Sequence, residues 1–401
     1  MIFKFMSTSI CSFVARERRH ALRAIGFRRP ARLARPREPL SNAVMSADST
    51  RPLRVGLLGY GLAGRVFHAP LIAATPGLVL AAVVTRDADR RASLRAAHPA
   101  AEPLGTPEEL WARASSLDLV VVATPNSSHV ALAQAALEAG LPVVVDKPFA
   151  PTAASARALV AAARAHGRLL TVFQNRRWDG DFLTVQQVVA GGALGAIHRF
   201  ESRFERWNPV PKVGWRERGE PEEAGGLLFD LGAHVIDQAL QLFGPVRTVY
   251  AEIDRRRAGV VVDDDSFVAL THASGTRSHL WVSKLCAQRG PRFRLLGERG
   301  AFTKFGLDGQ EAAMATGVLP GAPSWGEEPA EQWGVLGVDG SAAPVRTEPG
   351  AYPRFYAAVA AAVRSGGAMP VDPEDSIAGL DVIEAAQRSA ARGGAVELAA
   401  R

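Results

Sequence analysis

Short apolar runs alternate with longer amphipathic stretches through the first half of the chain. An uninterrupted apolar run predicts a buried strand, and apolar residues recurring every three or four positions predict a helix. Their alternation is typical of a parallel sheet covered by helices on both faces. The expected strands are 53–58, 78–84, 117–123 and 143–145, and the expected helices include 63–74, 130–138 and 153–165.

The pattern changes after residue 175. Residues 197–207 alternate aromatic and charged side chains, which places Phe200, Ser202 and Phe204 on one face of a strand. Residues 316–350 are rich in Gly, Pro and acidic residues and predict a long loop. Further strands separated by turn residues predict a large, mostly antiparallel sheet. These strands are 246–253, 266–272, 277–283 and 293–297, and two helices near 354–364 and 373–391 close the chain.

These patterns predict an α/β protein with two folded domains. Residues 51–173 are expected to form a doubly wound parallel sheet, and residues 174–401 an α/β domain with a large open sheet, mixed but mostly antiparallel. The length of 401 residues agrees with two domains of about 100–200 residues each. The closing helix could pack back on the first domain.

Composition is that of a globular protein, with 47% hydrophobic and 22% charged residues. The net charge of +7 arises in residues 1–50, because residues 51–401 hold 37 basic and 37 acidic residues. No nucleic-acid partner is therefore expected. No run reaches the about 18 apolar residues of a membrane helix, so no membrane partner is expected. Two cysteines, Cys11 and Cys286, exclude a disulfide scaffold and a Cys-rich zinc module, and we expect a cytoplasmic protein.

Residues 1–50 are dense in arginine, and Pro30, Pro36 and Pro39 interrupt any helix. A secretory signal would need an apolar core after Arg18 and Arg19, and none follows. A transit peptide stays open because the segment is rich in arginine and poor in acids. We favour a solvated, disordered extension or a translation start assigned too early, since Met45 lies just before the first strand.

A glycine-rich motif follows the first predicted strand and begins a predicted helix. It reads G-x-G-x-x-G and predicts a Rossmann-type dinucleotide site. The first glycine allows a tight turn, the second lets the backbone approach a pyrophosphate, and the third lets helix and strand pack closely. The helix N-terminus would then attract the phosphates. The motif consists of Gly59, Tyr60, Gly61, Leu62, Ala63 and Gly64.

The end of the second strand bears on the choice between NAD and NADP. An NAD site usually places Asp or Glu there, to bind the ribose 2′-hydroxyl. Here Thr85 and Arg86 occupy the position, and a hydroxyl with a guanidinium would hold a 2′-phosphate instead. We therefore predict NADP as the cofactor, while the neighbouring Asp87 keeps NAD possible.

Two further segments carry candidate chemistry. Lys147 follows an apolar strand within Asp146-Lys147-Pro148, so it should face the crevice where this fold binds ligands. Asp230 and His234 are four residues apart and would share one face of a helix. An imidazole near a carboxylate is a tunable acid or base near neutral pH. A surface lysine, a local cap and a packed core histidine are the structural alternatives.

These motifs, in this order, resemble the Gfo/Idh/MocA oxidoreductases over residues 53 to about 390. The shared motifs are the glycine-rich turn, Thr124-Pro125-Asn126 with His129, Asp146-Lys147-Pro148, and Asp230-Leu231-Gly232-x-His234. Asp146 replaces the family's usual Glu. Residues 172–182, 230–238 and 306–311 are similar to the NADP-dependent scyllo-inositol dehydrogenase branch, whereas the extension before Met45 has no counterpart there.

The resemblance implies a Rossmann domain followed by a domain that binds substrate and mediates oligomerisation, as a homodimer or homotetramer. It implies a hydride transfer between a nicotinamide and a secondary alcohol or ketone of a cyclitol or sugar, and an inositol-like ring is the expected substrate. His234 would remove the hydroxyl proton, Lys147 would hydrogen-bond the same oxygen, and Asp230 would orient one of them. No metal is expected, because the chain lacks a zinc dehydrogenase's ligand set.

The resemblance also suggests further contact residues. The cofactor would be bound by the glycine-rich turn together with Thr85, Arg86, Thr124, Pro125, Asn126, His129, Asp146 and Lys147. The polyol would be bound by Arg176, Trp178, Asp179, Arg206, Trp215 and His234, with Asp181, Glu205 and Arg216 as further candidates. Each could instead form a structural ion pair or lie at a domain interface, Arg177 and Asp181 above all. Alternative functions are another sugar or carbonyl substrate, or a non-catalytic dinucleotide-binding sensor.

Overall fold

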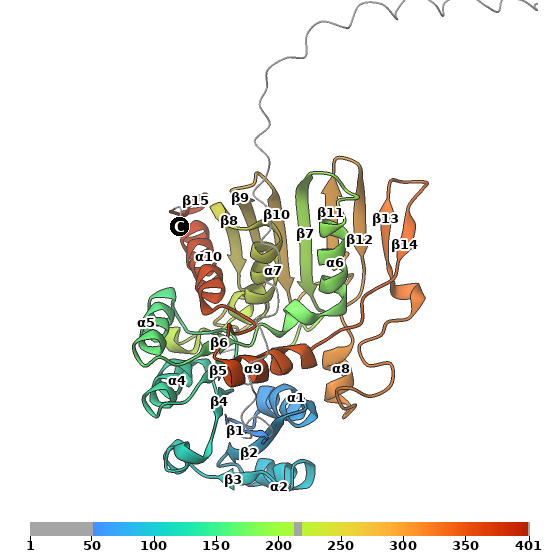
Figure 1. The fold of residues 1–401 in the computed structure, drawn as a ribbon. Coiled ribbons are helices and arrows are strands. Elements are labelled where there is room, and N and C mark those ends of the chain that lie inside the picture. The colour runs from blue at the N-terminus through green and yellow to red at the C-terminus, as the bar shows by residue number, and fades with distance from the viewer. Residues whose placement is uncertain (1–50, 212–218, 400–401) are drawn as a thin grey trace, which may run out of the picture. The chain divides into compact units, whose positions relative to one another are not determined.

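The computed structural model describes residues 51–211 and 219–399, and the statements below concern that part of the chain. The expectations for residues 1–50 lie outside it. The described residues form two β-sheets, each with helices packed on it (Figure 1). The first sheet, sheet A, comes from the N-terminal half, and the second, sheet B, comes from the C-terminal half.

Sheet A confirms the predicted doubly wound parallel sheet. Its six strands are all parallel and lie in the order β3-β2-β1-β4-β5-β6. From β1 the chain adds β2 and β3 on one side and then β4, β5 and β6 on the other. A ligand crevice opens at such a switch point, which here lies between β1 and β4. The valines of β4 and β5 are fully buried, as expected for strands covered on both faces. The strands are β1 (Leu53–Leu58), β2 (Leu78–Val84), β3 (Glu102–Leu104), β4 (Leu119–Val122), β5 (Val143–Val145) and β6 (Leu170–Val172).

Three helices of this half, α2, α3 and α5, begin at short polar residues that cap them. Asp87 caps α2, Thr106 caps α3, and Thr152 caps α5 in a reciprocal box with Ser155. The predicted helix 63–74 is divided, since its first part is a wide π-helical turn. The helices are η2 (Ala63–His68, π), α1 (Ala69–Ala74), α2 (Ala88–Ala97), α3 (Pro107–Trp111), η3 (Ala114–Ser116), η4 (Asn126–Ser128), α4 (His129–Glu138) and α5 (Ala153–Ala165).

Sheet B has nine strands in the order β14-β13-β12-β11-β7-β10-β9-β8-β15. The pair β7 and β10 is parallel and the other pairs are antiparallel, which confirms a mixed, mostly antiparallel sheet. The strands are β7 (Ile197–Glu205), β8 (Val246–Asp254), β9 (Asp265–His272), β10 (Arg277–Ser283), β11 (Phe293–Gly297), β12 (Gly300–Lys304), β13 (Gly334–Gly337), β14 (Ala343–Val345) and β15 (Val396–Glu397).

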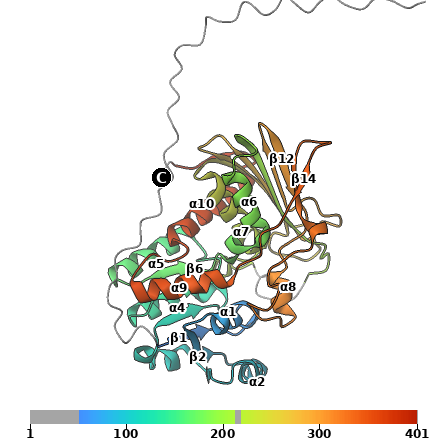
Figure 2. The ribbon, with the colours of Figure 1, turned by 45° about the vertical axis from the view of Figure 1, so that its right-hand side comes forward.

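Helices cover one face of sheet B, and Figure 2 shows α6, α7 and α10 on the same side of it. The predicted inward residues Phe200, Ser202 and Phe204 are fully buried. On the opposite face, the Arg203 guanidinium lies 3.9 Å from the ring centre of Trp281. The helices are η5 (Asn175–Trp178), α6 (Gly180–Ala190), η7 (Pro221–Glu223), η8 (Leu228–Gly232, π), α7 (Ala233–Phe243), α8 (Gln310–Ala315), η9 (Ala330–Gln332), α9 (Pro353–Ser365) and α10 (Pro373–Arg392).

Six short strands were not among those predicted from the sequence: β3, β6, β12, β13, β14 and β15. The expected loop 316–350 contains the hairpin β13–β14, which extends the edge of sheet B. The sequence pattern also omitted β3, the edge strand of sheet A. Both β3 and β14 are three residues long and contain a proline, so their sequences show no apolar alternation. Pairing with a neighbouring strand, rather than local pattern, makes them strands.

The last two helices connect the two halves of the described chain. In α9, Arg364 Nη2 donates to the carbonyl oxygens of Arg51 and Gly77, at 2.9 and 3.1 Å. In α10, Asp381 accepts hydrogen bonds of 2.7 Å from Arg157 of α5, while α10 also packs on β8. The chain end therefore contributes to the packing of both sheets.

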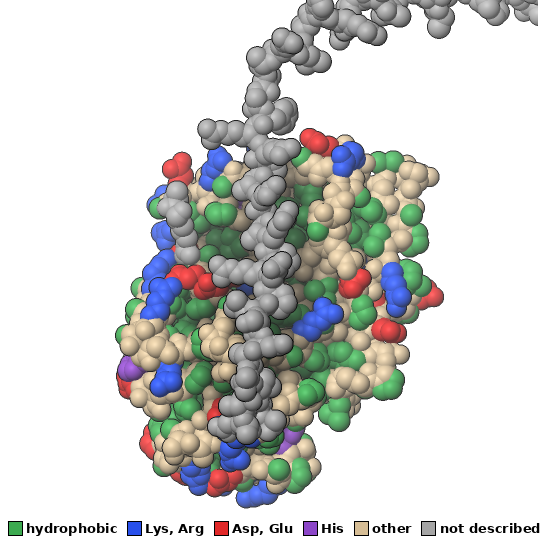
Figure 3. Space-filling view, in the orientation of Figure 1, with side chains coloured by type: hydrophobic (Ala, Val, Ile, Leu, Met, Phe, Trp, Pro, Cys, Tyr) green, Lys and Arg blue, Asp and Glu red, His purple; other side chains and the backbone are tan. Residues whose placement is uncertain are grey.

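The described surface mixes charges of both signs. Figure 3 shows basic and acidic side chains interspersed over one face, with hydrophobic side chains between them. None of the helices within residues 51–211 and 219–399 is long and apolar enough to cross a membrane.

Candidate active site

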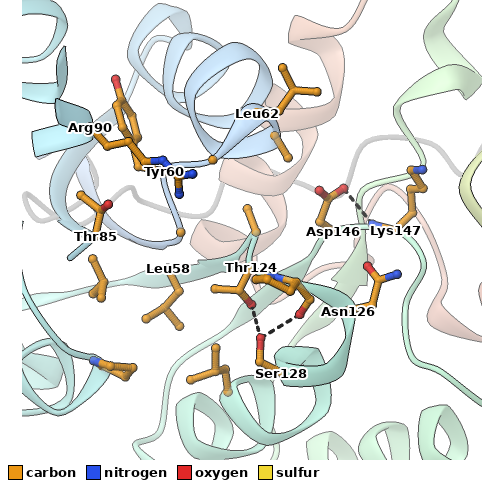
Figure 4. Close-up of a pocket in the computed structure, with 18 of the residues that line it drawn as sticks. Leu58, Tyr60, Leu62, Thr85, Arg90, Thr124, Asn126, Ser128, Asp146 and Lys147 are labelled. Atoms are coloured by element: carbon orange, nitrogen blue, oxygen red, sulfur yellow. Dashed lines mark hydrogen bonds between the residues drawn. The ribbon is translucent and has the colours of Figure 1, made fainter. Parts of the chain in front are cut away.

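A cavity of about 700 Å³ lies at the carboxyl ends of the sheet A strands. It extends from Thr85 and Arg90 at one end, past the glycine-rich turn, to Asp146 and Lys147 at the other (Figure 4). Its position is the switch point between β1 and β4, where open α/β sheets bind ligands. Its elongated shape and volume fit a dinucleotide.

The glycines of the turn shape the wall of this cavity. Gly59 has φ +96°, and a Cβ there would lie 2.5 Å from the carbonyl oxygen of Ala123. A Cβ on Gly64 would lie 2.1 Å from the carbonyl oxygen of Gly59. A Cβ on Gly61 would meet nothing closer than 4.0 Å, so the backbone there is open to an approaching group. These environments match the three glycine roles of a dinucleotide fold.

The end of the cavity beside β2 is basic. Thr85 is buried at its wall, and Arg86 and Arg90 also line it. Asp87 lines it too, but its carboxylate caps α2 by accepting a hydrogen bond of 2.9 Å from the Arg90 backbone N–H. Asp87 is the acid that left NAD possible in the sequence analysis, and in the structure its carboxylate is used as a helix cap. Arg90 was missed by sequence reasoning, although its position one helical turn beyond Arg86 was a signal.

The loop after β4 forms the opposite wall. Thr124, Pro125 and Asn126 line the cavity, and the Asn126 amide donates to the carbonyl oxygen of Glu223 at 2.8 Å. His129 does not line it. Its ring nitrogens lie 2.9 Å from the carbonyl oxygens of Thr124 and Pro148, so it ties together the loops after β4 and β5. The expected cofactor contact of His129 is therefore corrected to a supporting role.

Lys147 lies at the inner end of the cavity. Its Nζ donates to the carbonyl oxygen of Asp230 at 2.7 Å and to the carboxylate of Asp230 at 2.9 Å. The Asp146 carboxylate accepts a hydrogen bond of 2.8 Å from the Lys147 backbone N–H. Burial would raise the pKa of Asp146, but nearby His68 and Lys147 hold it below its ordinary value. Asp146 is thus an anion beside the ammonium group.

A second cavity of about 170 Å³ adjoins the first. The two share Leu62, Ala63, Asp146, Lys147 and Asp230 as lining residues. Lys147 lines both cavities, whereas His234 lines only the second. At about 30 Å³ per water, the second cavity has the volume of five or six waters, which suits one small ring.

His234 is held as a neutral base. Its pKa lies well below the ordinary value because the ring is buried and because Lys147, Arg176 and Arg292 are positively charged. Its Nδ1 is buried without a hydrogen-bond partner among the described residues. Sequence reasoning placed the Asp230 carboxylate beside either His234 or Lys147. The structure shows that it binds Lys147, while both Asp230 and His234 line the same cavity.

The remaining predicted substrate residues separate into two groups. Arg176 and Arg206 line the second cavity. Trp178 and Asp179 do not line it, which corrects their expected role. Asp179 lies beneath Arg176, where it accepts hydrogen bonds from Tyr352 Oη at 2.6 Å and Arg176 Nη1 at 3.3 Å.

Other candidates have structural partners or lie outside the description. Trp178 packs edge-on against Phe355, with ring centres 5.6 Å apart. Trp215 and Arg216 lie outside the described residues. Arg177 pairs with Asp237 and Asp375, and Asp181 lies 3.7 Å from Arg292, so both belong to buried ion pairs.

The structure adds residues that the sequence reasoning left without a role. Glu311 of α8 reaches the second cavity and pairs with Arg176. Phe67 and Phe173 supply aromatic wall, and Asn175 supplies an amide. Asn175 and Glu311 belong to the two stretches similar to the inositol branch, and that similarity was the available signal. Among residues 51–211 and 219–399, no group of His, Cys, Asp or Glu is arranged to hold a metal ion.

Comparison with known proteins gives two domain matches. Residues 53–174 match the family described as "Oxidoreductase family, NAD-binding Rossmann fold". Residues 182–303 match "GFO/IDH/MocA C-terminal domain". The two matches include the glycine-rich turn, Lys147, Asp230 and His234.

Individual relatives match over most of their length. The oxidoreductase YdgJ of Escherichia coli strain K12 is 40% identical over 342 residues, which is 84% of this chain and 96% of YdgJ. The scyllo-inositol 2-dehydrogenase (NADP(+)) IolW of Bacillus subtilis strain 168 is 34% identical over 341 residues, which is 84% of this chain and 93% of IolW.

A solved structure gives the same assignment. The oxidoreductase YPO2259 of Yersinia pestis is 39% identical and superimposes with a TM-score of 0.81, over 89% of this chain and 100% of that chain. The matched domains, the relatives and the shared fold agree with the motifs and the cavity. The chain belongs to the Gfo/Idh/MocA family of oxidoreductases.

Proposed function

We propose that this oxidoreductase is an NADP-dependent dehydrogenase of a cyclitol or small sugar, with an inositol-like ring as the substrate. The observation that carries the proposal is the junction of the two cavities. There Lys147 lines both the dinucleotide-sized cavity and the ring-sized one, and a neutral His234 lines the ring-sized cavity. A secondary alcohol at this junction would meet both a hydrogen-bond donor and a base.

NADP would be held by the glycine-rich turn, the loop after β4, and the basic end of the cavity. Thr85, Arg86 and Arg90 would bind a 2′-phosphate, because Asp87 is engaged as a helix cap. When bound, the oxidised nicotinamide would supply the acceptor for the hydride of an alcohol carbon. The NADP preference is also supported by the name of IolW, which is 34% identical to this chain.

The protein's own residues would handle the proton and the developing charge. Neutral His234 takes the proton from the substrate hydroxyl, while the carbinol carbon loses hydride and the product is a ketone. Lys147 donates a hydrogen bond to the same oxygen and stabilises its negative charge. Asp230 orients Lys147 through its carboxylate and its carbonyl oxygen. In the reverse direction, protonated His234 returns its proton to the ketone oxygen.

The substrate class is supported by the second cavity. Its volume of about 170 Å³ fits a single ring better than a disaccharide. Arg176, Arg206, Glu311 and Asn175 provide donors and acceptors, and Phe67 and Phe173 provide aromatic wall, as polyol recognition requires. The names of two relatives, scyllo-inositol 2-dehydrogenase and D-apiose dehydrogenase, describe cyclitol and sugar substrates.

The test is absorbance of reduced nicotinamide, measured with the full-length protein. NADP and NAD are each offered with scyllo-inositol, myo-inositol and D-glucose. We expect turnover of scyllo-inositol with NADP. Turnover with NAD but not with NADP would support the proposed hydride transfer and refute the proposed site for the 2′-phosphate. Tight NADPH binding without turnover would favour another carbonyl substrate, and then the sensor function.

Two variants test the residue roles. Lys147→Met and His234→Asn should each lower kcat by about 10²–10⁴-fold, the usual contribution of acid–base groups. NADPH binding, followed by nicotinamide fluorescence, serves as the folding control and should stay nearly unchanged for His234→Asn, since His234 lies outside the first cavity. Unchanged kcat in both variants would contradict these roles.

We also propose a homodimer or homotetramer formed through the uncovered face of sheet B, and action in the cytoplasm. Aromatic side chains gather on that face, where the ring centres of Phe267 and Trp281 are 5.0 Å apart and those of Phe267 and His279 are 5.9 Å apart. These three side chains are partly exposed, and a partly exposed aromatic cluster of this kind is typical of protein interfaces. Fractionation of the producing cell tests the location.

A further inference from the structure

Among the described residues that line the second cavity, basic and acidic side chains are equal in number. Lys147, Arg176 and Arg206 bring three positive charges, and Asp146, Asp230 and Glu311 bring three negative charges. Asp146 and Asp230 lie next to Lys147. Glu311 is the acid beside the two arginines, so the charge of that side of the cavity depends on it.

Glu311 contacts both arginines. Its carboxylate accepts a short hydrogen bond from Arg176 Nη2 and lies 4.0 Å from Arg206 Nη2. Burial would raise the pKa of Glu311, but Arg176, Arg206 and Lys147 hold it below its ordinary value. The carboxylate is therefore an anion at neutral pH and occupies donors that could otherwise bind a substrate.

The position of Glu311 is set by its neighbours in the chain. The Asp308 carboxylate accepts from the Gln310 backbone N–H at 2.8 Å, at the start of α8. The Gln310 side chain donates to the carbonyl oxygen of Trp178 at 3.1 Å and accepts from the Tyr352 backbone N–H at 2.8 Å. These bonds hold α8 against the wall of the cavity and direct Glu311 towards the arginines.

Arg176 is held independently of Glu311. Asp179 bonds its Nη1, and the Phe204 ring centre lies 4.7 Å from its guanidinium carbon. Removing the negative charge of Glu311 would therefore leave Arg176 in place. Arg206 is 46% exposed and lies over the same ring at 5.2 Å. The two guanidiniums would then face the cavity as a ready site for a carboxylate.

We propose that Glu311 sets the charge class of the substrate. Its carboxylate neutralises the arginine pair, so the cavity takes a neutral polyol and rejects the corresponding sugar acid. This inference rests on the proposed function, because it assumes that the second cavity binds the substrate. It assigns Glu311 as a specificity-determining residue that contacts a substrate hydroxyl rather than one that takes part in proton transfer.

The experiment compares the binding of D-glucose and D-glucuronate, which differ in one carboxylate. Calorimetry is done on full-length protein saturated with NADPH. The unaltered protein should bind glucose more tightly than glucuronate. Glu311→Gln keeps the size of the side chain and should improve glucuronate binding about tenfold to a hundredfold, the range expected for charge-assisted hydrogen bonds. The quantity compared is the ratio of the dissociation constants for glucuronate and glucose. The same ratio in the unaltered protein and in Glu311→Gln would overturn the proposal.

Two further variants complete the design. Glu331→Gln removes the same charge from an exposed residue that does not line the cavity, and it should leave the ratio unchanged. Adding Arg206→Gln to Glu311→Gln should remove most of the gain for glucuronate. Arg206→Gln alone should make glucuronate bind more weakly still, and it tests the proposal if Glu311→Gln does not fold. A gain that persists in the double variant would contradict the arginine pair as its origin.

Failure of the proposed function gives a different result. Suppose that Glu311→Gln favours glucuronate over glucose while neither sugars nor inositols are oxidised. In that case Glu311 does select the charge of the ligand, and the reaction of the protein is a different one. If inositol is oxidised and the ratio does not change, the function holds and the role of Glu311 is refuted.

Discussion

The neighbours of His234 keep its imidazole neutral at the cavity that it shares with Lys147. Lys147 contacts the Asp230 carboxylate, whereas His234 is buried and surrounded by the positive charges of Lys147, Arg176 and Arg292. The same cationic environment that suits a developing oxyanion therefore keeps the imidazole unprotonated. Each side chain reaches the role proposed for it without a metal ligand set in the described residues.

The pH profile of alcohol oxidation should show this effect. An ordinary histidine, with a pKa near 6.5, would lose half of its basic form at about that pH. Because the pKa of His234 is lower, kcat/KM should fall only as the pH drops well below 6.5. The free energy of unfolding should also fall as the pH drops below 6.5, because the unfolded chain then takes up a proton at His234 that the folded protein does not. An acid limb at or above 6.5, measured with NADP binding as the control, would contradict this assignment.

Cofactor choice is also decided by single side chains. Arg90→Ala should raise the KM for NADP by about tenfold or more and leave the KM for NAD nearly unchanged, because a 2′-phosphate would lose one charge-assisted hydrogen bond. Arg95→Ala is the matched control, since it lies exposed on the same helix and does not line the cavity. Equal effects on both cofactors would refute a phosphate contact by Arg90.

At the scale of elements, the site is built where helices begin. Within the described residues, the π-helical turns are η2 and η8, and each contributes lining residues to the second cavity. Single π turns inside helices are frequent at functional sites. Apolar periodicity predicted the helix at 63–74 that contains η2, but it cannot distinguish an i→i+5 turn from an i→i+4 turn.

Helix α5 offers a test of local sequence signals. Thr152 caps it by accepting a hydrogen bond from the Ser155 backbone N–H at 3.1 Å. Thr152→Ala should reduce the free energy of unfolding by about 1 kcal/mol, measured by denaturant titration. Thr152→Ser keeps the hydroxyl and should retain most of the stability. The kinetics should not change, because Thr152 lines neither cavity; an equal loss in both variants would exclude the cap as the cause.

At the scale of the whole molecule, the C-terminal helices join the two halves, and one face of sheet B has none of the helices of residues 51–211 and 219–399 on it. Tyr250 is 37% exposed, and the Phe267, His279 and Trp281 rings lie close to one another. Burying such aromatic area against a second copy would favour association. The oligomer is thus proposed from a surface, whereas the active site is proposed from cavities.

Light scattering coupled to gel filtration tests the proposed oligomer. The unaltered protein should have the mass of a dimer or tetramer, and Trp281→Glu should shift it towards the monomer because a charge would be buried at the contact. Val318→Glu introduces the same charge at an exposed residue outside sheet B, in the segment after α8, and should leave the mass unchanged. A monomeric unaltered protein would refute the interface.

The sequence was sufficient for features that depend on neighbours along the chain. Apolar runs located β1, β2 and β5, and the glycine spacing located the dinucleotide turn. The position of Lys147 directly after an apolar strand was enough to predict that it faces the crevice. The order of motifs indicated the family. These features are local because periodicity, capping and turn conformation involve residues within one or two helical turns.

Only the tertiary structure decided which distant residues meet. The Asp230 carboxylate binds Lys147, 83 positions away, and Glu311 binds Arg176, 135 positions away. The short strands β3 and β14 exist because a neighbouring strand pairs with them, and Asp179 accepts a hydrogen bond from Tyr352, 173 positions away. The physical reason is the same in each case. Ion pairs and edge pairing depend on which surfaces the packed domains bring together, and no local pattern contains that information.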